Sequence, residues 1–277
     1  MGDCKYCAKP AGFLRSSHSN CKVANQKALS AIIDAARLAM KGSSAMDPIR
    51  SSILSLAHQS KVSDLDLRDA LATAWSQTVE EYLQDGLIEP DKEQRLSAFQ
   101  QLFSLQQQDL DKNGAYIRVA KAGVLRSLMQ GKLPARVAVA GGLPINLQKG
   151  ESIIWAFRDV QMLEDKTRRE FVGRSQGMSF RIMKGVYYRV GGFKGTPIET
   201  TQRVNVDTGM MVVTDKNLYF AGPIKSIRVP FSKIVAFHPY DDGVGVMKDA
   251  ANAKAQVFIT KDGWFTYNLL TNICNIQ

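Results

Sequence analysis

The stretch GMMVVTDKNLYFAGPIKSIRVPFSKIVAFH, residues 209–238, decides how the C-terminal half of the chain folds. Apolar and polar residues alternate on both sides of the polar triplet Asp215–Asn217, which predicts a β-hairpin with its turn at that triplet. A third alternating run, 224–229, ends at Pro230, because proline has no N–H to donate to a sheet. Another strand begins at Ile234. The stretch therefore predicts consecutive β-strands joined by short turns.

The residue order in this stretch, G-x-x-x-x-T-D-x-x-L-Y-F-x-G followed by K-x-I-x-V-P-F-S-K-I, resembles the core of GRAM and bacterial pleckstrin-homology-like domains. The resemblance extends from about Lys149 to the C-terminus. It implies a curved antiparallel sheet of about seven strands, closed at one end by a C-terminal helix. It also implies a binding role without a catalytic signature.

The rest of the C-terminal half fits this architecture. Apolar residues from Trp264 to Ile273 have helical spacing, as expected of the closing helix, and Cys274 on that helix is expected to be a buried, small apolar group. The segment Arg136–Leu147 is expected to be a linker that packs as a short strand. Further strands are expected at 152–157, 168–172, 179–183, 186–190, 243–247 and 256–260.

Composition places the chain among ordinary globular proteins. It has 277 residues, 45% hydrophobic and 22% charged, which is enough for two domains and a small module. No run reaches the ~18 apolar residues of a membrane-spanning helix, and the N-terminus lacks the apolar core of a signal peptide. We therefore expect a cytoplasmic protein.

The net charge of +10 is unevenly placed along the chain. Residues 1–27 carry +4, residues 28–135 carry −1, and residues 136–277 carry +7. Both ends are therefore candidates for contact with an anionic partner, although a basic balance also serves solubility.

The first 21 residues contain the pattern Cys4-x2-Cys7-x10-His18-x2-Cys21. Two ligands at this spacing can hold one side of a Zn²⁺ ion, and a second pair completes a tetrahedron. The pattern is similar to small zinc ribbons and knuckles, in which metal binding supplies the folding free energy that a tiny core cannot. Four protein ligands would make the site structural. The alternatives are two disulfides or uncommitted thiols.

Residues 22–133 have helical periodicity and predict a bundle of about five or six helices. Its centre, YLQDGLIEPDKEQRLSAFQQLFSLQQQDLD, resembles the tellurite-resistance B-like helical fold, in which acidic side chains can bind metal. Asp85, Gly86, Ile88 and Glu93 match that pattern, with Glu93 one position late, so helix capping is the competing interpretation.

The segment Asp109–Gly114 opens like an EF-hand calcium loop, D-x-D-x-N-G. Position 12 of such a loop should be a bidentate glutamate, but here it is Ala120, and position 8 is Tyr116. We therefore predict a solvated turn between helices without a calcium site.

These observations predict an α+β chain with four parts. They are a zinc ribbon or knuckle at 1–24, an all-α helical bundle at 25–133, a linker at 134–148, and an antiparallel β-barrel or sandwich of the pleckstrin-homology or GRAM type at 149–277, closed by a C-terminal helix.

The chain lacks a Walker loop and a G-x-G-x-x-G fingerprint. The favoured function is a non-enzymatic adaptor that engages a protein partner, with an anionic surface as a second contact. In pleckstrin-homology-like domains the early hairpins often bind anionic groups. The matching candidates here are Arg174, Arg181, Lys184, Arg189 and Lys194, for which a solvated sheet face is the competing interpretation.

Two alternatives remain open. The first is a nucleic-acid-binding protein led by the basic N-terminal module, which offers phosphate contacts and stacking rings. Its candidates are Lys5, Tyr6, Lys9, Phe13, Arg15 and Lys22. The second is an unrecognised metal-dependent enzyme that uses the acidic helical turn.

Overall fold

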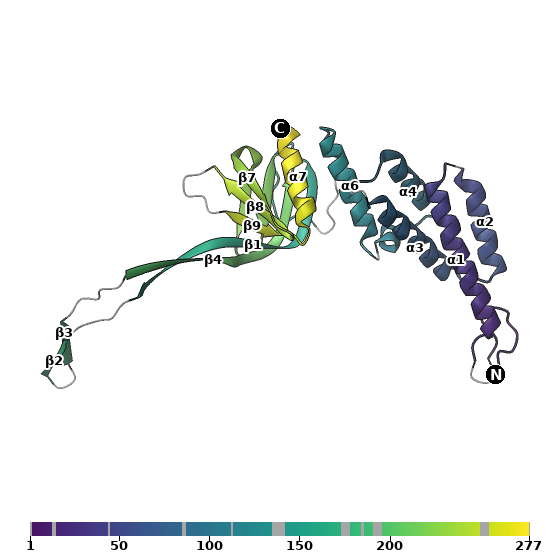
Figure 1. The fold of residues 1–277 in the computed structure, drawn as a ribbon, viewed down its shortest axis with the longest axis horizontal. Helices are drawn as coiled ribbons and strands as arrows, with labels where there is room; N and C mark the ends of the chain where they lie inside the picture. Colours follow the sequence, from purple (N-terminus) through teal and green to yellow (C-terminus); the bar gives the residue numbers. More distant parts are fainter. Residues whose placement is uncertain are drawn as a thin grey trace. The chain divides into compact units, whose positions relative to one another are not determined.

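A computed structural model describes most of the chain (Figure 1). The described residues are 2–12, 15–43, 45–84, 87–111, 113–134, 142–172, 178–183, 186–190, 196–249 and 255–276, with the backbone alone described between 166 and 201. The chain divides into two compact units, Met1–Ser127 and Leu128–Gln277.

The first unit is helical, as the periodicity predicted. Its elements are α1 (Ser19–Lys41), α2 (Met46–Gln59), α3 (Asp64–Tyr82), α4 (Pro90–Leu102), the single turn α5 (Gln107–Leu110) and α6 (Ala115–Met129). The starts follow local chemistry, since the Ser63 hydroxyl accepts the Asp66 N–H at the start of α3 and Pro90 opens α4.

The core of this unit is formed by the apolar stripes of α1, α3 and α4. Met40, Trp75 and Phe99 are almost completely buried there. The Trp75 indole N–H donates to the Leu96 carbonyl at 3.2 Å, so the one polar atom of that side chain is satisfied. At the edge of the core, Glu81 on α3 forms ion pairs with Arg37 and Lys41 on α1.

The second unit is an antiparallel sheet with a C-terminal helix, as the resemblance implied. Its seven-stranded sheet has the order β6-β5-β4-β1-β9-β8-β7, and β2 pairs with β3 as a separate hairpin. The strands are β1 (Ile153–Val172), β2 (Met178–Met183), β3 (Val186–Val190), β4 (Thr196–Thr214), β5 (Asn217–Ala221), β6 (Ser226–Pro230), β7 (Ile234–Pro239), β8 (Gly243–Lys248) and β9 (Gln256–Ile259). The closing helix is α7 (Gly263–Ile276).

The predicted central hairpin is confirmed. β4 pairs with β5 in the register Val212↔Tyr219 and Val213↔Leu218, and β5 pairs with β6 up to Pro230. After Pro230 a single 3-10 turn, Phe231–Lys233, leads into β7. The turn between β4 and β5 contains Asp215, whose carboxylate accepts the Ser152 N–H at 2.8 Å.

Strand β1 differs from the prediction. Two strands were expected, at 152–157 and 168–172, but the chain forms one strand of 20 residues. The intervening residues are charged, and β4 supplies a continuous partner for them from Thr214 back to Thr196, with irregular register near Asp159. Past Glu164 on β1, the described residues of β1 and β4 pair only with each other (Figure 1). We call the part beyond the Asp165↔Arg203 pair, residues 166–172 and 196–202, the ribbon.

The sheet unit has its own core beneath α7. Phe220 and Phe258 lie 5.9 Å apart between ring centroids, and Phe265 on α7 contacts Trp155 edge-on at 5.0 Å. Thr266 is also fully buried, and its hydroxyl is 2.7 Å from the hydroxyl of Thr260. Cys274 is half-buried, and burial raises the pKa of its thiol.

Glu151 fastens the start of β1 to the central hairpin. Its carboxylate accepts the Tyr219 hydroxyl at 2.7 Å, the Thr214 hydroxyl at 3.0 Å and the Asn217 side-chain amide. It also accepts the Gln148 N–H at 2.6 Å. All three side-chain donors belong to residues that are at least 96% buried. We call these five residues the Glu151 network.

Two expectations are not confirmed. The sheet ends at β6 on one side and β7 on the other, and within the described residues no ladder joins them, so the expected barrel closure is not confirmed. Residues 142–147 form no strand, and 135–141 lie outside the described residues. Among the described helices, none is both long and apolar enough to cross a bilayer.

Candidate metal centre

The N-terminal cysteine pair sits in a tight turn. The Cys4 N–H donates to the Lys9 carbonyl and the Ala8 N–H to the Cys4 carbonyl, each at 2.8 Å. Ala8 has a left-handed backbone, φ 57°, which reverses the chain so that Asp3 and Pro10 form a β-bridge. This turn brings the Cys4 and Cys7 sulfurs to the same side.

The second pair of ligands is built into the start of α1. His18 is the N-cap residue of α1, with extended backbone (φ −77°, ψ 146°), and Cys21 follows in the first helical turn. Residues at these two positions face each other across a helix N-terminus, where Ser and Glu form a capping box in other proteins. Here His18 makes no side-chain capping hydrogen bond, so its ring is available to the site.

The four side chains converge on one point. One ligand atom from each of Cys4, Cys7, His18 and Cys21 lies within 4.8 Å of the others. The His18 Nδ1 atom is 3.4 Å from the Cys7 sulfur and 3.8 Å from the Cys21 sulfur. A tetrahedral ion with metal–sulfur bonds of about 2.3 Å and metal–nitrogen bonds of about 2.1 Å places its sulfur and nitrogen ligands about 3.6 Å apart. The geometry therefore fits a four-coordinate metal ion.

The histidine has the support that metal ligands need. Its Nε2 atom is 3.0 Å from the Pro10 carbonyl oxygen, which can only accept, so Nε2 carries the proton. Nδ1 is then left with its lone pair for the site, close to the sulfurs of Cys7 and Cys21. A carbonyl partner that fixes the tautomer in this way is the usual outer contact of a metal-ligating histidine.

The surroundings of Cys4 favour a thiolate, and those of Cys21 do not. Burial would raise the pKa of Cys4, but backbone N–H groups of His18, Tyr6 and Cys7 point at its sulfur and lower that pKa to about 6. The His18 N–H is 3.4 Å from the sulfur. For Cys21, burial and the neighbouring sulfurs of Cys7 and Cys4 raise the pKa to about 11. Three sulfurs this close repel one another as thiolates unless a cation lies between them.

This cluster is a candidate metal centre of closed type. Four protein side chains fill a tetrahedron and leave no position for substrate or water, so such a site stabilises structure and does not catalyse. Within the described residues, it is the one group of Cys, His, Asp and Glu side chains close enough to hold an ion. The four cysteines of the chain form no disulfide in the structure.

The basic residues proposed for nucleic acid are close to the cluster residues in sequence. Lys5, Lys9, Arg15 and Lys22 are all exposed. The Lys5 ammonium lies over the Tyr6 ring, 4.8 Å from its centroid. Phe13 lies outside the described residues.

The anionic-surface candidates fall on β2, β3 and their flanks. The register pairs Arg181 with Tyr187 and Arg189 with Ser179 on neighbouring strands. Arg174, Lys184 and Lys194 lie outside the described residues.

The acidic positions of the helical unit have other partners. Glu93 forms an ion pair with Arg126 on α6, which also donates to the Ile88 carbonyl. Asp109 accepts the Gln106 N–H at 2.8 Å in a capping box at the start of α5 and pairs with Arg68 at 3.2 Å. Asp85 lies outside the described residues.

Sequence reasoning missed two features. The Pro10 carbonyl that orients His18 carries no side-chain signal, and a pocket in the helical unit is assembled from residues far apart in the chain. Comparison of the chain with protein-family models, curated proteins and solved structures found no match.

Proposed function

We propose that this chain is a non-enzymatic adaptor. A structural zinc ion would stabilise its N-terminal module through Cys4, Cys7, His18 and Cys21. Its C-terminal unit, of the pleckstrin-homology-like type, would hold it on an anionic surface while it binds a protein partner. Three sulfurs and one imidazole nitrogen in a tetrahedron are the donor set that zinc prefers, which supports the choice of metal.

The position of the positive charge carries this proposal. Residues 166–201 contain eight Lys or Arg against two Asp or Glu, a net charge of +6. The other residues of 136–277 contain eleven against ten, a net charge of +1. The surplus is therefore concentrated between the outer ends of β1 and β4. Seven antiparallel strands followed by a C-terminal helix support the family resemblance from which the binding role is inferred.

The expected affinity is modest. A basic residue near an anionic membrane contributes ~1 kcal/mol, so three or four engaged together would give weak recruitment. Because the charges are solvent-accessible in such a complex, high salt should weaken it.

Vesicle sedimentation with the full chain tests the proposal. The parent should sediment with phosphatidylserine-containing vesicles at low salt, and not with neutral phosphatidylcholine vesicles. Lys184→Glu combined with Arg189→Glu should abolish that binding. A second variant, in which Asn-Gly replaces residues 166–202, should abolish it too and still fold, since Asp165 and Arg203 are directly paired and a two-residue turn can join them.

The control removes charge elsewhere on the same unit. Lys216, Lys233 and Lys261 are exposed, and replacing all three with Gln should leave binding intact. Failure of the parent to bind anionic vesicles, or equal loss in the control, would reject the anionic-surface contact.

A second candidate function, nucleic-acid binding, is favoured by the four exposed cations close in sequence to the residues of the metal centre. It predicts a salt-dependent mobility shift with oligonucleotides that Lys5→Glu with Lys9→Glu abolishes and the 166–202 replacement does not. A shift that needs residues 166–202 would exclude the N-terminal module as the binding element.

A further inference from the structure

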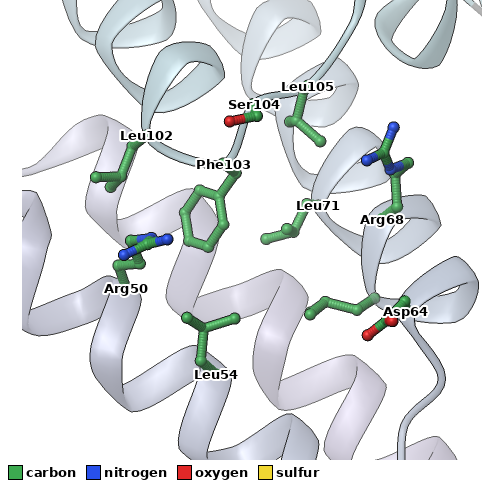
Figure 2. A pocket seen from close by; sticks show the side chains of 10 residues that line it. Arg50, Leu54, Asp64, Arg68, Leu71, Leu102, Phe103, Ser104 and Leu105 are labelled. Atoms are coloured by element: carbon green, nitrogen blue, oxygen red, sulfur yellow. The ribbon is translucent and has the colours of Figure 1, made fainter.

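The helical unit contains a pocket of about 300 Å³ between α2, α3 and the turn that follows α4 (Figure 2). Apolar side chains form most of its lining: Leu54, Leu67, Leu71, Leu102, Phe103 and Leu105. Leu71 and Leu105 are buried, whereas Leu54 is 39% exposed and Phe103 is half-buried. The pocket therefore has a closed apolar floor and an apolar wall that reaches the surface.

The turn after α4 shapes one side of the pocket. The Leu105 N–H donates to the Gln100 carbonyl and the Ser104 N–H to the Gln101 carbonyl, which is the Schellman pattern of a helix C-terminus. Ser104 takes the left-handed position of that motif, with φ 51°. The motif turns Leu105 into the core and leaves the Phe103 ring facing the pocket (Figure 2).

The charged residues of the lining make the pocket asymmetric. Arg50 and Asp64 are both exposed and stand on opposite sides of the apolar lining (Figure 2). Arg68 is occupied, because its guanidinium pairs with Asp109 at 3.2 Å. Arg50 has no carboxylate partner among the described residues. An occupant that places a negative charge beside Arg50 is therefore complementary to the charge of the pocket. One that places a negative charge beside Asp64 would be repelled.

The size of the pocket restricts the occupant. About 300 Å³ is the lower end of small-ligand pockets, so it suits one large apolar side chain and part of its neighbour better than a whole cofactor. Grooves between helices commonly accept an amphipathic helix, whose anchors recur every three or four residues. An anchor and an acidic residue one turn away would lie on the same face of such a helix.

We propose that this pocket binds an amphipathic helical segment of a partner protein, which inserts a Leu or Phe side chain between Leu54 and Phe103 and pairs an Asp or Glu, one turn away, with Arg50. The proposal rests on the adaptor function and names the chemistry of its protein partner.

The probe is a library of displayed random peptides of about twelve residues, roughly three helical turns, selected on the full zinc-loaded chain. Enriched peptides should share a Leu or Phe with an Asp or Glu three or four residues away. The best peptide, synthesised with a fluorophore, is then measured by fluorescence anisotropy against variants.

Arg50→Glu and Leu54→Asp should each lower the affinity for that peptide by tenfold or more. Replacing the acidic residue of the peptide with Lys should restore its binding to the Arg50→Glu variant. The matched controls are Lys27→Glu and Leu38→Asp, which make the same changes at exposed positions of α1 outside the pocket and should leave affinity unchanged. Circular dichroism of each variant checks that the bundle is folded.

Three results would overturn the proposal. They are a selection without the apolar–acidic pattern, equal affinity of Arg50→Glu and Lys27→Glu for the peptide, and direct calorimetric binding of dodecanoate when no peptide is selected, which would make the occupant a small carboxylate. The vesicle assay separates this failure from failure of the anionic-surface contact. Arg50→Glu should sediment with phosphatidylserine vesicles like the parent, and the 166–202 replacement should bind the peptide like the parent.

Discussion

Replacing Glu151 with Ala should destabilise the sheet unit by about 3 kcal/mol. The Glu151 carboxylate accepts four hydrogen bonds that join the segment before β1 to β4 and β5. Asn217 keeps the Gln148 side-chain oxygen as a second partner, and Thr214 keeps the Asn217 carbonyl. Tyr219 is the donor that loses most, because its residue is 4% exposed and its neighbour Arg228 can only donate.

The expected cost of Glu151→Ala follows from how many of these donors are left without an acceptor. A hydrogen bond to a charged group contributes about 1.5–3 kcal/mol, and a buried donor left without an acceptor costs about 1–3 kcal/mol. We assign about half of the loss to Tyr219 and half to the other donors together. In a double-mutant cycle, Tyr219→Phe should therefore reduce the additional cost of Glu151→Ala by about 1.5 kcal/mol.

Hydrogen exchange of the β4 and β5 amides measures this cost locally, which matters because a chain of two units need not unfold in one step. A loss of less than about 1 kcal/mol in the free energy of opening of these amides would refute the idea that the Glu151 network holds β1 on the sheet. Additive effects of Glu151→Ala and Tyr219→Phe would refute it too.

The same network predicts the direction of a pH effect. Burial would raise the pKa of Glu151, but hydrogen bonds from Asn217, Tyr219, Gln148 and Thr214 hold it below its usual value of 4.5. A carboxyl whose pKa is lowered by folding stabilises the fold above its unfolded pKa and loses that contribution as pH falls through the folded pKa. Exchange protection of β4 and β5 should therefore fall below about pH 4.5. Glu151→Gln should flatten that dependence, and an unchanged profile would contradict the assignment.

Three further predictions concern other parts of the chain. Purified protein should contain about one zinc ion per chain, lost on replacing Cys4 and Cys21 with Ser, and a zinc content near zero by elemental analysis in the parent would exclude the site. Calorimetry should find no calcium binding at residues 109–120, since Asp109 is engaged with Gln106 and Arg68 and position 12 is Ala120; micromolar affinity abolished by Asp109→Ala would contradict this. Gly263→Ala should cost roughly 2–3 kcal/mol or prevent folding of the sheet unit, because the added methyl group would lie 1.8 Å from the Tyr240 carbonyl oxygen. Gly123→Ala should cost less, because the nearest atom to the added methyl group would be a Glu93 side-chain oxygen at 3.2 Å. Thermal unfolding of the two variants measures the difference.

Features with a local cause were predictable from the sequence. The hairpin at Asp215–Asn217 and the helices have periodicities that a short window contains. The Cys4–Cys7 and His18–Cys21 spacings each fit within one turn of chain, and the structure brings these four candidate ligands together as the spacing predicted.

Features that depend on distant partners were not predictable. The charged residues near the middle of β1 read as a break, and they are in a strand because β4, about forty residues later, pairs with them. The Glu151 network joins residues more than sixty positions apart. The lining of the pocket comes from two separate segments, 50–71 and 102–105, and neither alone has the pattern of a binding site.

The overlap of the metal centre with α1 has a mechanical consequence. Because His18 is the N-cap residue of the 23-residue helix α1 and Cys21 lies in its first turn, an ion held by both would fix the N-terminal turn to the end of α1. A module joined to a bundle by a linker can rotate, but this one would stay fixed to the end of α1, which is about 35 Å long at a rise of about 1.5 Å per residue and packs in the core of the helical unit. A partner that bound the N-terminal module would then set the orientation of the helical unit as well as its location.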